Sequence, residues 1–188
     1  MMKYILASKS PRRKELLSLV VKEFEIDSVE TKEEIDETIP FTKAIEKIAM
    51  QKAEAVSSKH PTDLIISADT IVTLGSKRYG KPKDPADAMK MLQELSGSIH
   101  EVITGVCLYC NGKAHTFSSV SKVEFYPLTE EEIKWYVDSK EPLDKAGAYG
   151  IQGLGSLLVK EIQGDYYSIM GLPIAMLKRE LEHFESTL

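Results

Sequence analysis

The stretch from Leu64 to Val72 constrains the fold most strongly, because nearly every position in it is apolar. A continuous apolar run of this length is typical of a strand that is buried on both faces. Such a strand needs other elements to cover it, and residues 42–58 just before it have helical periodicity. The apolar stripe of that helix consists of Ile45, Ile48, Ala49 and Val56. The pattern therefore predicts an α/β fold.

Strands and helices alternate along the rest of the chain, which indicates an α/β domain with a mixed, twisted sheet. The patterns predict further strands at residues 4–7, 24–29, 99–109 and 114–126. They predict helices at residues 14–20, 85–95, 130–137 and 173–183. Asn111-Gly112 indicates a hairpin turn, and a further hairpin is expected around Gln163-Gly164-Asp165, between residues 157–162 and 166–170. Trp135 is expected in the core.

Composition narrows the class of protein. The length of 188 residues suits one domain covering 1–188, and 24 Lys and Arg against 29 Asp and Glu give a net charge of −5. An acidic chain is not expected to bind nucleic acid, and no apolar run reaches the length of a membrane span. We expect a cytoplasmic protein without a signal peptide, because the short apolar stretch at residues 4–7 is explained by the first strand. Cys107 and Cys110 are expected to be core cysteines rather than a redox or zinc site.

The segment Ser8–Arg13 combines helix-start signals with the wrong charge. Ser10 is a good N-cap and Pro11 a good first helical residue. Arg12 and Arg13 then occupy the first turn, where the positive end of the helix dipole favours acidic residues. A bound polyanion such as phosphate would compensate both charges. We therefore expect an anion site here, and alanine at either arginine is expected to leave stability unchanged or improved.

Two further charged residues lie in apolar surroundings. Asp69 is the only charge in the run from Leu64 to Val72. A buried carboxylate is costly unless it is paired, hydrogen-bonded or bound to metal, so a functional role is favoured over a structural one. Lys52 lies on the apolar stripe of the 42–58 helix, where a snorkelling lysine is favoured over an ammonium directed at phosphate.

Five motifs together carry a resemblance to a known family. They are Ala7-Ser8-Lys9-Ser10-Pro11-Arg12-Arg13, Ser67-Ala68-Asp69-Thr70, Gly80-Lys81-Pro82, Lys145-Ala146-Gly147-Ala148-Tyr149-Gly150-Ile151-Gln152-Gly153 and Gly171-Leu172-Pro173. In this order they resemble the Maf family of nucleoside triphosphate pyrophosphatases. The resemblance implies an elongated mixed sheet flanked by helices, as in the inosine triphosphate pyrophosphatases, with a cleft between two lobes.

The family resemblance also implies an activity. A nucleoside triphosphate would be hydrolysed to the monophosphate and pyrophosphate by metal-dependent attack of water on the α-phosphorus, with Mg²⁺ or Mn²⁺ as the cofactor. The segment Lys145–Gly153 resembles the branch that prefers dTTP and UTP. The alternatives are a pyrophosphatase for 7-methyl-GTP or another modified nucleotide, and a nucleotide-binding regulator of cell division. A homodimer is a further expectation from the family.

Each candidate site residue matches a motif position of the family. Asp69 matches the catalytic position, as base or as metal ligand, and Glu33 matches a second carboxylate that would hold the metal with it. The specificity positions are matched by Arg12, Thr70 and Gln152. The phosphate-binding positions are matched by Ser8, Arg12, Arg13, Lys52 and Lys81. Since neighbouring strand residues face opposite ways, the strand must break or bulge if Asp69 and Thr70 both line the site.

Overall fold

The structure is a computed structural model that describes residues 2–188. It confirms a mixed α/β fold with a seven-stranded sheet, in the order β2-β1-β3-β5-β6-β7, with β4 paired to β3. The chain divides into two compact units, which are described separately. The first contains the chain up to Asp69, Thr104–Ser119 and Gly171–Leu188, and the second contains Thr70–Ile103 and Val120–Met170. A single domain and a cleft between lobes stay predictions.

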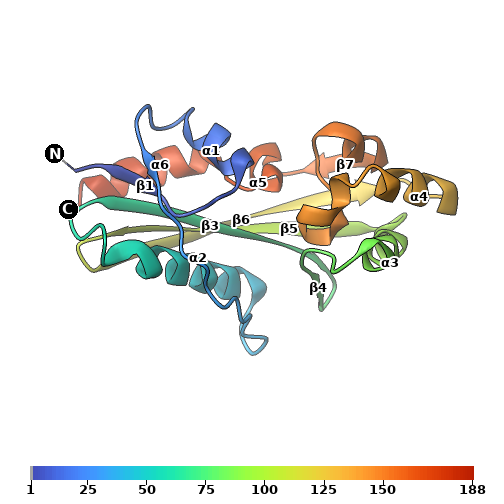
Figure 1. The fold of residues 1–188 in the computed structure, drawn as a ribbon, viewed down its shortest axis with the longest axis horizontal. Helices are drawn as coiled ribbons and strands as arrows, with labels where there is room; N and C mark the ends of the chain where they lie inside the picture. The colour runs from blue at the N-terminus through green and yellow to red at the C-terminus, as the bar shows by residue number, and fades with distance from the viewer. Residues whose placement is uncertain (1) are drawn as a thin grey trace. The chain divides into compact units, whose positions relative to one another are not determined.

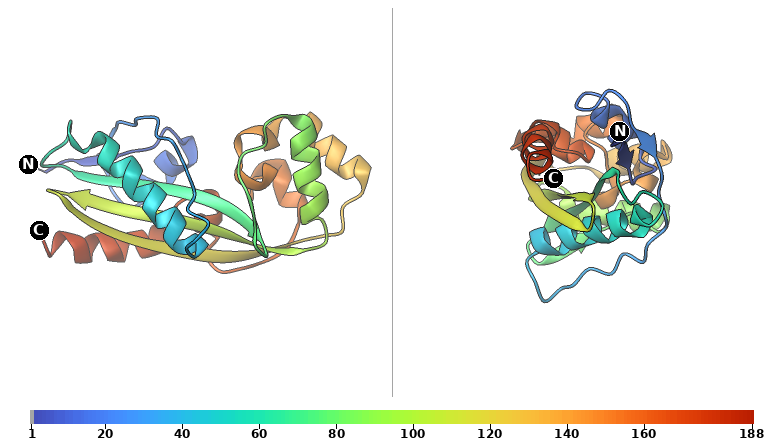
Figure 2. Two further views of the ribbon diagram at one scale, coloured as in Figure 1. Left: turned by 90° about the horizontal axis from the view of Figure 1, so that it is seen from below. Right: turned by 90° about the vertical axis from the view of Figure 1, so that its left-hand side faces the viewer.

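The first unit surrounds the beginning of the long strand β3 (Leu64–Leu74). Parallel pairing joins β1 (Tyr4–Leu6) to β3 on one side and to β2 (Glu25–Ile26) on the other. Helix α2 (Phe41–Ser57) lies on one side of these strands, and α1 (Pro11–Leu17) and α6 (Ile174–Glu185) lie on the other (Figures 1 and 2). This arrangement explains why residues 64–68 are buried, as the apolar run predicts.

The second unit contains the end of β3, where β4 (Lys77–Tyr79) pairs antiparallel with it. Strand β7 (Val159–Gln163) pairs antiparallel with β6 (Lys113–Phe125). Helix α3 (Pro85–Leu95) packs on α4 (Glu130–Asp138) and on the short 3-10 helix η2 (Ala146–Ala148). The core of this unit includes Val72, Leu92, Phe125 and Tyr136.

Several local predictions are confirmed. Helix α3 has the expected bounds, and Thr129 caps α4 in a complete capping box with Glu132. Strands β5 (Ile99–Cys110) and β6 flank a turn in which Asn111 and Gly112 both have positive φ, as a two-residue hairpin requires. The two cysteines are free and buried.

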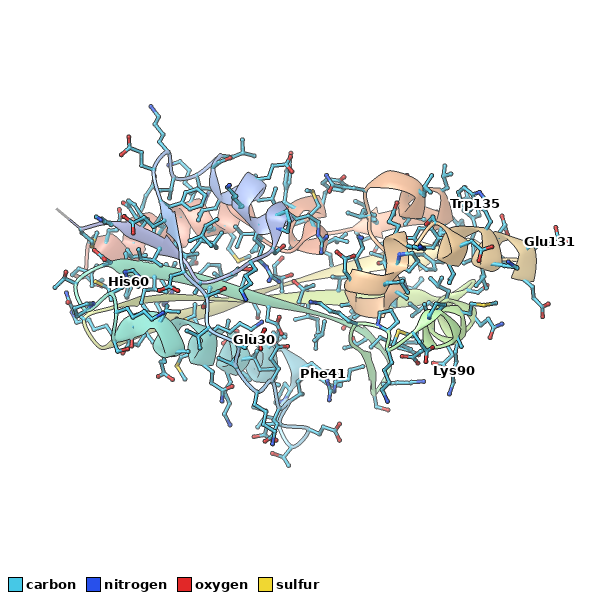
Figure 3. All side chains as sticks on the ribbon, viewed as in Figure 1. Glu30, Phe41, His60, Lys90, Glu131 and Trp135 are labelled. Atoms are coloured by element: carbon cyan, nitrogen blue, oxygen red, sulfur yellow. The ribbon has the colours of Figure 1, made fainter. Side chains whose placement is uncertain are left out.

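Other local predictions are wrong. Residues 166–170 form helix α5 (Tyr166–Met170) instead of a hairpin strand, because the Asp165 side chain accepts hydrogen bonds from the N–H groups of Tyr167 and Ser168. Trp135, labelled in Figure 3, is 48% exposed on α4 and does not belong to the core. Strand β2 has only two residues, and α1, which begins at Pro11 as expected, ends at Leu17 rather than at residue 20. Among residues 2–188, no helix is both long and apolar enough to span a membrane.

Candidate active site

The start of α1 has the capped geometry that the sequence predicts. Ser10 has extended backbone angles, and its hydroxyl accepts a hydrogen bond from Arg13 N at 3.4 Å. Ser8 is buried, and its Oγ accepts from Ser10 N at 3.2 Å. The first turn of the helix contains no acidic residue. The positive end of the helix therefore retains both arginines and no carboxylate of its own.

Arg13 also connects α1 to the chain just before α6. Its Nε donates to the carbonyl oxygen of Gly171 at 2.9 Å, and its Nη1 donates to Ser8 Oγ at 3.4 Å. Gly171 has φ +123°, and a Cβ there would lie 3.4 Å from Arg13 Nε. A side chain at this position would be strained and would press on the guanidinium. Glycine at 171 is therefore required for this contact.

The electrostatic environment of Arg13 joins the arginines to the candidate carboxylates. Burial lowers the pKa of the Arg13 guanidinium; the charge of Asp69 raises this pKa, that of Arg12 lowers it and that of Glu33 raises it. Arginine stays charged throughout the physiological range. The charges of Asp69 and Glu33 thus act on the Arg13 guanidinium within the first unit.

Lys52 holds the two candidate carboxylates. Its Nζ lies 2.8 Å from Asp69 Oδ1 and 2.7 Å from Glu33 Oε1, and the Lys52 side chain is only 16% exposed. The Ser67 hydroxyl donates to the carbonyl oxygen of Ala49 at 2.5 Å, which attaches α2 to β3 beside this pair. The favoured interpretation of Lys52 as a snorkelling lysine is wrong, since its ammonium lies between two carboxylates rather than in open water.

The chemistry of Asp69 and Glu33 fits a divalent metal ion shared with a substrate. Asp69 Oδ1 and Glu33 Oε1 both contact Lys52 Nζ, at 2.8 Å and 2.7 Å, so the two carboxylates lie close together. Magnesium is usually held by one or two carboxylates together with substrate phosphates and water. Within residues 2–188, no group of three or more His, Cys, Asp or Glu side chains is arranged to hold a metal ion. Asp69 and Glu33 are the two carboxylates here that could hold such an ion.

Three other predicted site residues belong to the second unit. Lys81 is exposed on the loop after β4, and Gln152 is exposed at the start of η3 (Gly153–Leu158). The N–H of Gly147 donates to the carbonyl oxygen of Gly80 at 3.0 Å, so the Lys81 loop is attached to the glycine-rich segment. Thr70 is the third. That Lys81, Gln152 and Thr70 share one site with Asp69 stays a prediction.

The pair Asp69 and Thr70 does not show the expected break. Strand β3 runs continuously from Leu64 to Leu74 through both residues, and both are half-buried. Successive side chains of a strand point to opposite faces. The specificity assignment of Thr70 thus stays a prediction that the strand does not favour.

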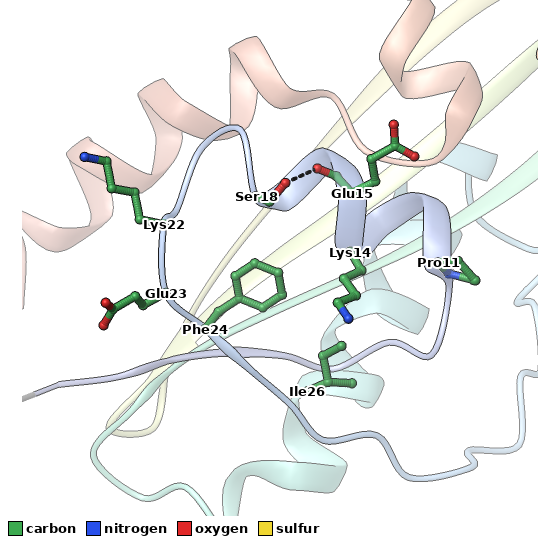
Figure 4. A pocket seen from close by; sticks show the side chains of 8 residues that line it. All are labelled: Pro11, Lys14, Glu15, Ser18, Lys22, Glu23, Phe24 and Ile26. Atoms are coloured by element: carbon green, nitrogen blue, oxygen red, sulfur yellow. Dashed lines mark hydrogen bonds between the residues drawn. The ribbon is translucent and has the colours of Figure 1, made fainter.

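A separate pocket lies beside α1 (Figure 4). It is lined by residues of α1 and of the segment that follows, including Lys14, Lys22 and Phe24. None of the predicted site residues is among those that line it. This pocket is therefore a feature distinct from the candidate active site.

Sequence reasoning missed the carbonyl of Gly171 and the Glu141 carboxylate, which binds backbone N–H groups next to Gln152. The Gly171 contact uses a backbone oxygen, and the Glu141 carboxylate binds backbone N–H groups, so one partner in each contact leaves no pattern in side-chain types. The Gly171-Leu172-Pro173 motif is the signal that could have identified the first. Glu141 gave none.

The fold first defines a class, that of α/β proteins with a mixed seven-stranded sheet flanked by helices. Within this class the chain belongs to the Maf-like protein family, whose sequence model matches residues 3–184. It is 53% identical to proteins named dTTP/UTP pyrophosphatase from Bacillus cytotoxicus and from Bacillus mycoides, over 99% of this chain and 97% of each relative. The Ham1 protein of Staphylococcus aureus has a similar fold, with a TM-score of 0.52 at 12% identity over 96% of this chain and 98% of that one.

Proposed function

We propose that the protein hydrolyses nucleoside triphosphates, dTTP and UTP foremost, to the monophosphate and pyrophosphate. The observation that carries this proposal is the Lys52 bridge between Asp69 and Glu33, in the same unit as the arginine-bearing start of α1. The two relatives named dTTP/UTP pyrophosphatase support the choice of substrate. Assembly as a homodimer and a location in the cytoplasm stay predictions.

The chain supplies positive charge where a triphosphate needs it. Attack on the α-phosphorus requires little covalent help from the protein, and it depends on positioning and on neutralising the charge of the leaving pyrophosphate. The half-buried Arg12 and Arg13, the Ser8 hydroxyl and the positive end of the α1 helix dipole are suited to bind phosphate oxygens. Lys81 would add a cation from the second unit.

Asp69 is the group that would act on the water. The hydrogen bond from Lys52 fixes the direction of its carboxylate, and the half-buried position limits access of bulk water. Asp69 and Glu33 would hold the metal ion, which would supply positive charge to the phosphates and make the attacking water more acidic. Asp69 then has two candidate roles, taking the proton of the water or holding the ion beside it.

Gln152 would select the base. Its amide carries both a donor and an acceptor, which match the O4 and N3–H of uracil and thymine. Cytosine presents the opposite pattern at these two positions, so a Gln152 amide held in one orientation would reject CTP by leaving a donor or an acceptor unpaired. Guanine presents the same acceptor and donor pattern at O6 and N1–H, so the preference for dTTP and UTP over 7-methyl-GTP is supported by the relatives named dTTP/UTP pyrophosphatase.

Release of pyrophosphate from dTTP, UTP, CTP and 7-methyl-GTP in the presence of Mg²⁺ tests the proposal. We expect dTTP and UTP to have the highest kcat/KM, and Asp69→Asn to abolish turnover while the protein remains folded. Asp138→Asn is the matched control, because Asp138 is an exposed residue of α4. Normal turnover by Asp69→Asn would refute the catalytic assignment. Tight binding of dTTP without metal-dependent release would instead support the regulator.

A further inference from the structure

Gln152 lies at the tip of a loop that closes on itself. A Cβ at Gly155 would lie 2.1 Å from the carbonyl oxygen of Gly150 and 2.6 Å from the hydroxyl of Tyr136. Only glycine fits such a contact, because the backbone of residue 155 touches that of residue 150. The five-residue step from Gly150 to Gly155 is therefore a tight loop with the exposed Gln152 inside it.

The carboxylate of Glu141 binds the second half of this loop. Its Oε1 accepts hydrogen bonds from Gly155 N and from the Tyr136 hydroxyl, both at 3.0 Å. Its Oε2 accepts from Leu154 N, also at 3.0 Å. Hydrogen bonds to a charged acceptor are roughly twice as strong as those between neutral groups. The Glu141 side chain thus fixes the two residues that follow Gly153.

Tyr136 binds the first half of the same loop. Its hydroxyl, which donates to Glu141, also accepts a hydrogen bond from Gly150 N at 3.1 Å. Tyr136 is fully buried, and burial raises the pKa of its phenol. The phenol therefore keeps its proton and can donate and accept at once. Together the two side chains hold backbone N–H groups on both sides of Gln152.

We propose that Glu141 and Tyr136 are positioning residues for base selection, which we name the Glu141–Tyr136 clamp. The clamp fixes the backbone from Gly150 to Gly155 and thereby directs the Gln152 amide at the base of the nucleotide. It rests on the proposed function for the identity of the ligand, while the loop geometry stands apart from it. Both residues act through Gln152.

Kinetics on Glu141→Gln and Tyr136→Phe test the clamp. Each variant is nearly isosteric with its parent but loses at least one of the hydrogen bonds that fix the loop. We expect KM for dTTP and UTP to rise and the preference for UTP over CTP to fall about tenfold, with kcat changed less than about threefold. The matched controls are Glu130→Gln and Tyr126→Phe, which replace exposed residues of the same unit.

A double-mutant cycle separates positioning from a general structural role. In a Gln152→Ala background, Tyr136→Phe should have no further effect on the UTP preference, since the residue that it positions is gone. An equal loss of preference in both backgrounds would overturn the proposal. So would a fall in kcat with KM and preference unchanged. Tyr136→Phe keeps the test decisive if Glu141→Gln fails to fold.

Amide hydrogen exchange tests the clamp without reference to catalysis. In the nucleotide-free protein, Tyr136→Phe should speed exchange at Gly150 N–H, and Glu141→Gln should speed it at Leu154 and Gly155. Unchanged exchange at these positions would overturn the clamp even if the enzyme hydrolyses dTTP. Faster exchange in a protein without pyrophosphatase activity would support the clamp and refute the proposed function.

Discussion

Acid is expected to destabilise this protein through one buried histidine, His100. The side chain lies on β5 and the residue is only 1% exposed. Its Nε2 lies 2.7 Å from the hydroxyl of Tyr149, and its ring meets that of Phe125 edge to face, with centroids 4.8 Å apart. Burial lowers the pKa of the imidazole from 6.5 to about 4. The folded protein therefore holds His100 neutral under conditions in which an exposed histidine is protonated.

The sign and size of the effect follow from linkage between protonation and folding. Between pH 6.5 and 4 the unfolded chain binds a proton at residue 100 and the folded chain does not. The free energy of unfolding therefore decreases as the pH is lowered through this window. Each pH unit is equivalent to about 1.4 kcal/mol, which gives a loss of about 3 kcal/mol across the window. Above pH 7 the residue contributes no slope, and below pH 4 the loss is complete.

Urea unfolding at pH 7, 6, 5 and 4 measures this loss. His100→Gln removes the titration and retains a polar group opposite Tyr149, so its stability should decline about 3 kcal/mol less than that of the parent between pH 7 and 4. His183→Gln, at an exposed position of α6, is the control and should follow the parent. Equal pH slopes for the parent and His100→Gln would refute the reasoning.

Three further predictions concern the candidate site. Arg13→Ala should lower the free energy of unfolding by about 1–3 kcal/mol because the guanidinium bonds Gly171 O and Ser8 Oγ, which revises the expectation of unchanged stability. Arg12→Ala should leave the free energy of unfolding unchanged or raised, because the charge of Arg12 opposes the helix dipole, and urea unfolding distinguishes the two. Gly171→Ala should lose about 1–3 kcal/mol through its positive φ, with a parallel loss of pyrophosphate release. EDTA should abolish that release and added Mg²⁺ or Mn²⁺ should restore it; full activity after EDTA would contradict a metal shared by Asp69 and Glu33.

Local signals predict those parts of the fold whose cause is local. The Ser10-Pro11 pair specifies the start of α1, because capping and the fixed φ of proline need only neighbouring residues. The buried run around Asp69 specifies β3, because a strand covered on both faces has to be apolar throughout. The Asp165 cap of α5 is equally local, and its neighbourhood was misinterpreted because the two tyrosines that follow favour strands.

Long-range pairing explains what the sequence left open at Lys52. Helical periodicity places this lysine on the buried stripe, but its partners come from a loop near residue 33 and from β3. Nothing in a local window shows which carboxylates reach an ammonium across the fold. Burial of the lysine and of one carboxylate becomes favourable only when the pair forms. The two ambiguous charges of the sequence, Lys52 and Asp69, therefore have a single explanation.

The division of roles along β3 has a similar physical basis. Asp69 and Thr70 are neighbours in one continuous strand, so their side chains leave on opposite faces, and only Asp69 is held by Lys52. A motif match assigns adjacent letters to one site and contains no information on faces. Side chains along a strand alternate between its two faces, and this alternation supplies what the motif lacks. By it, the Asp69 carboxylate, which Lys52 of α2 orients, and the Thr70 side chain are expected on opposite faces of β3. Sequence motifs thus propose which residues form the site, while the period of the strand bears on which of them can act together.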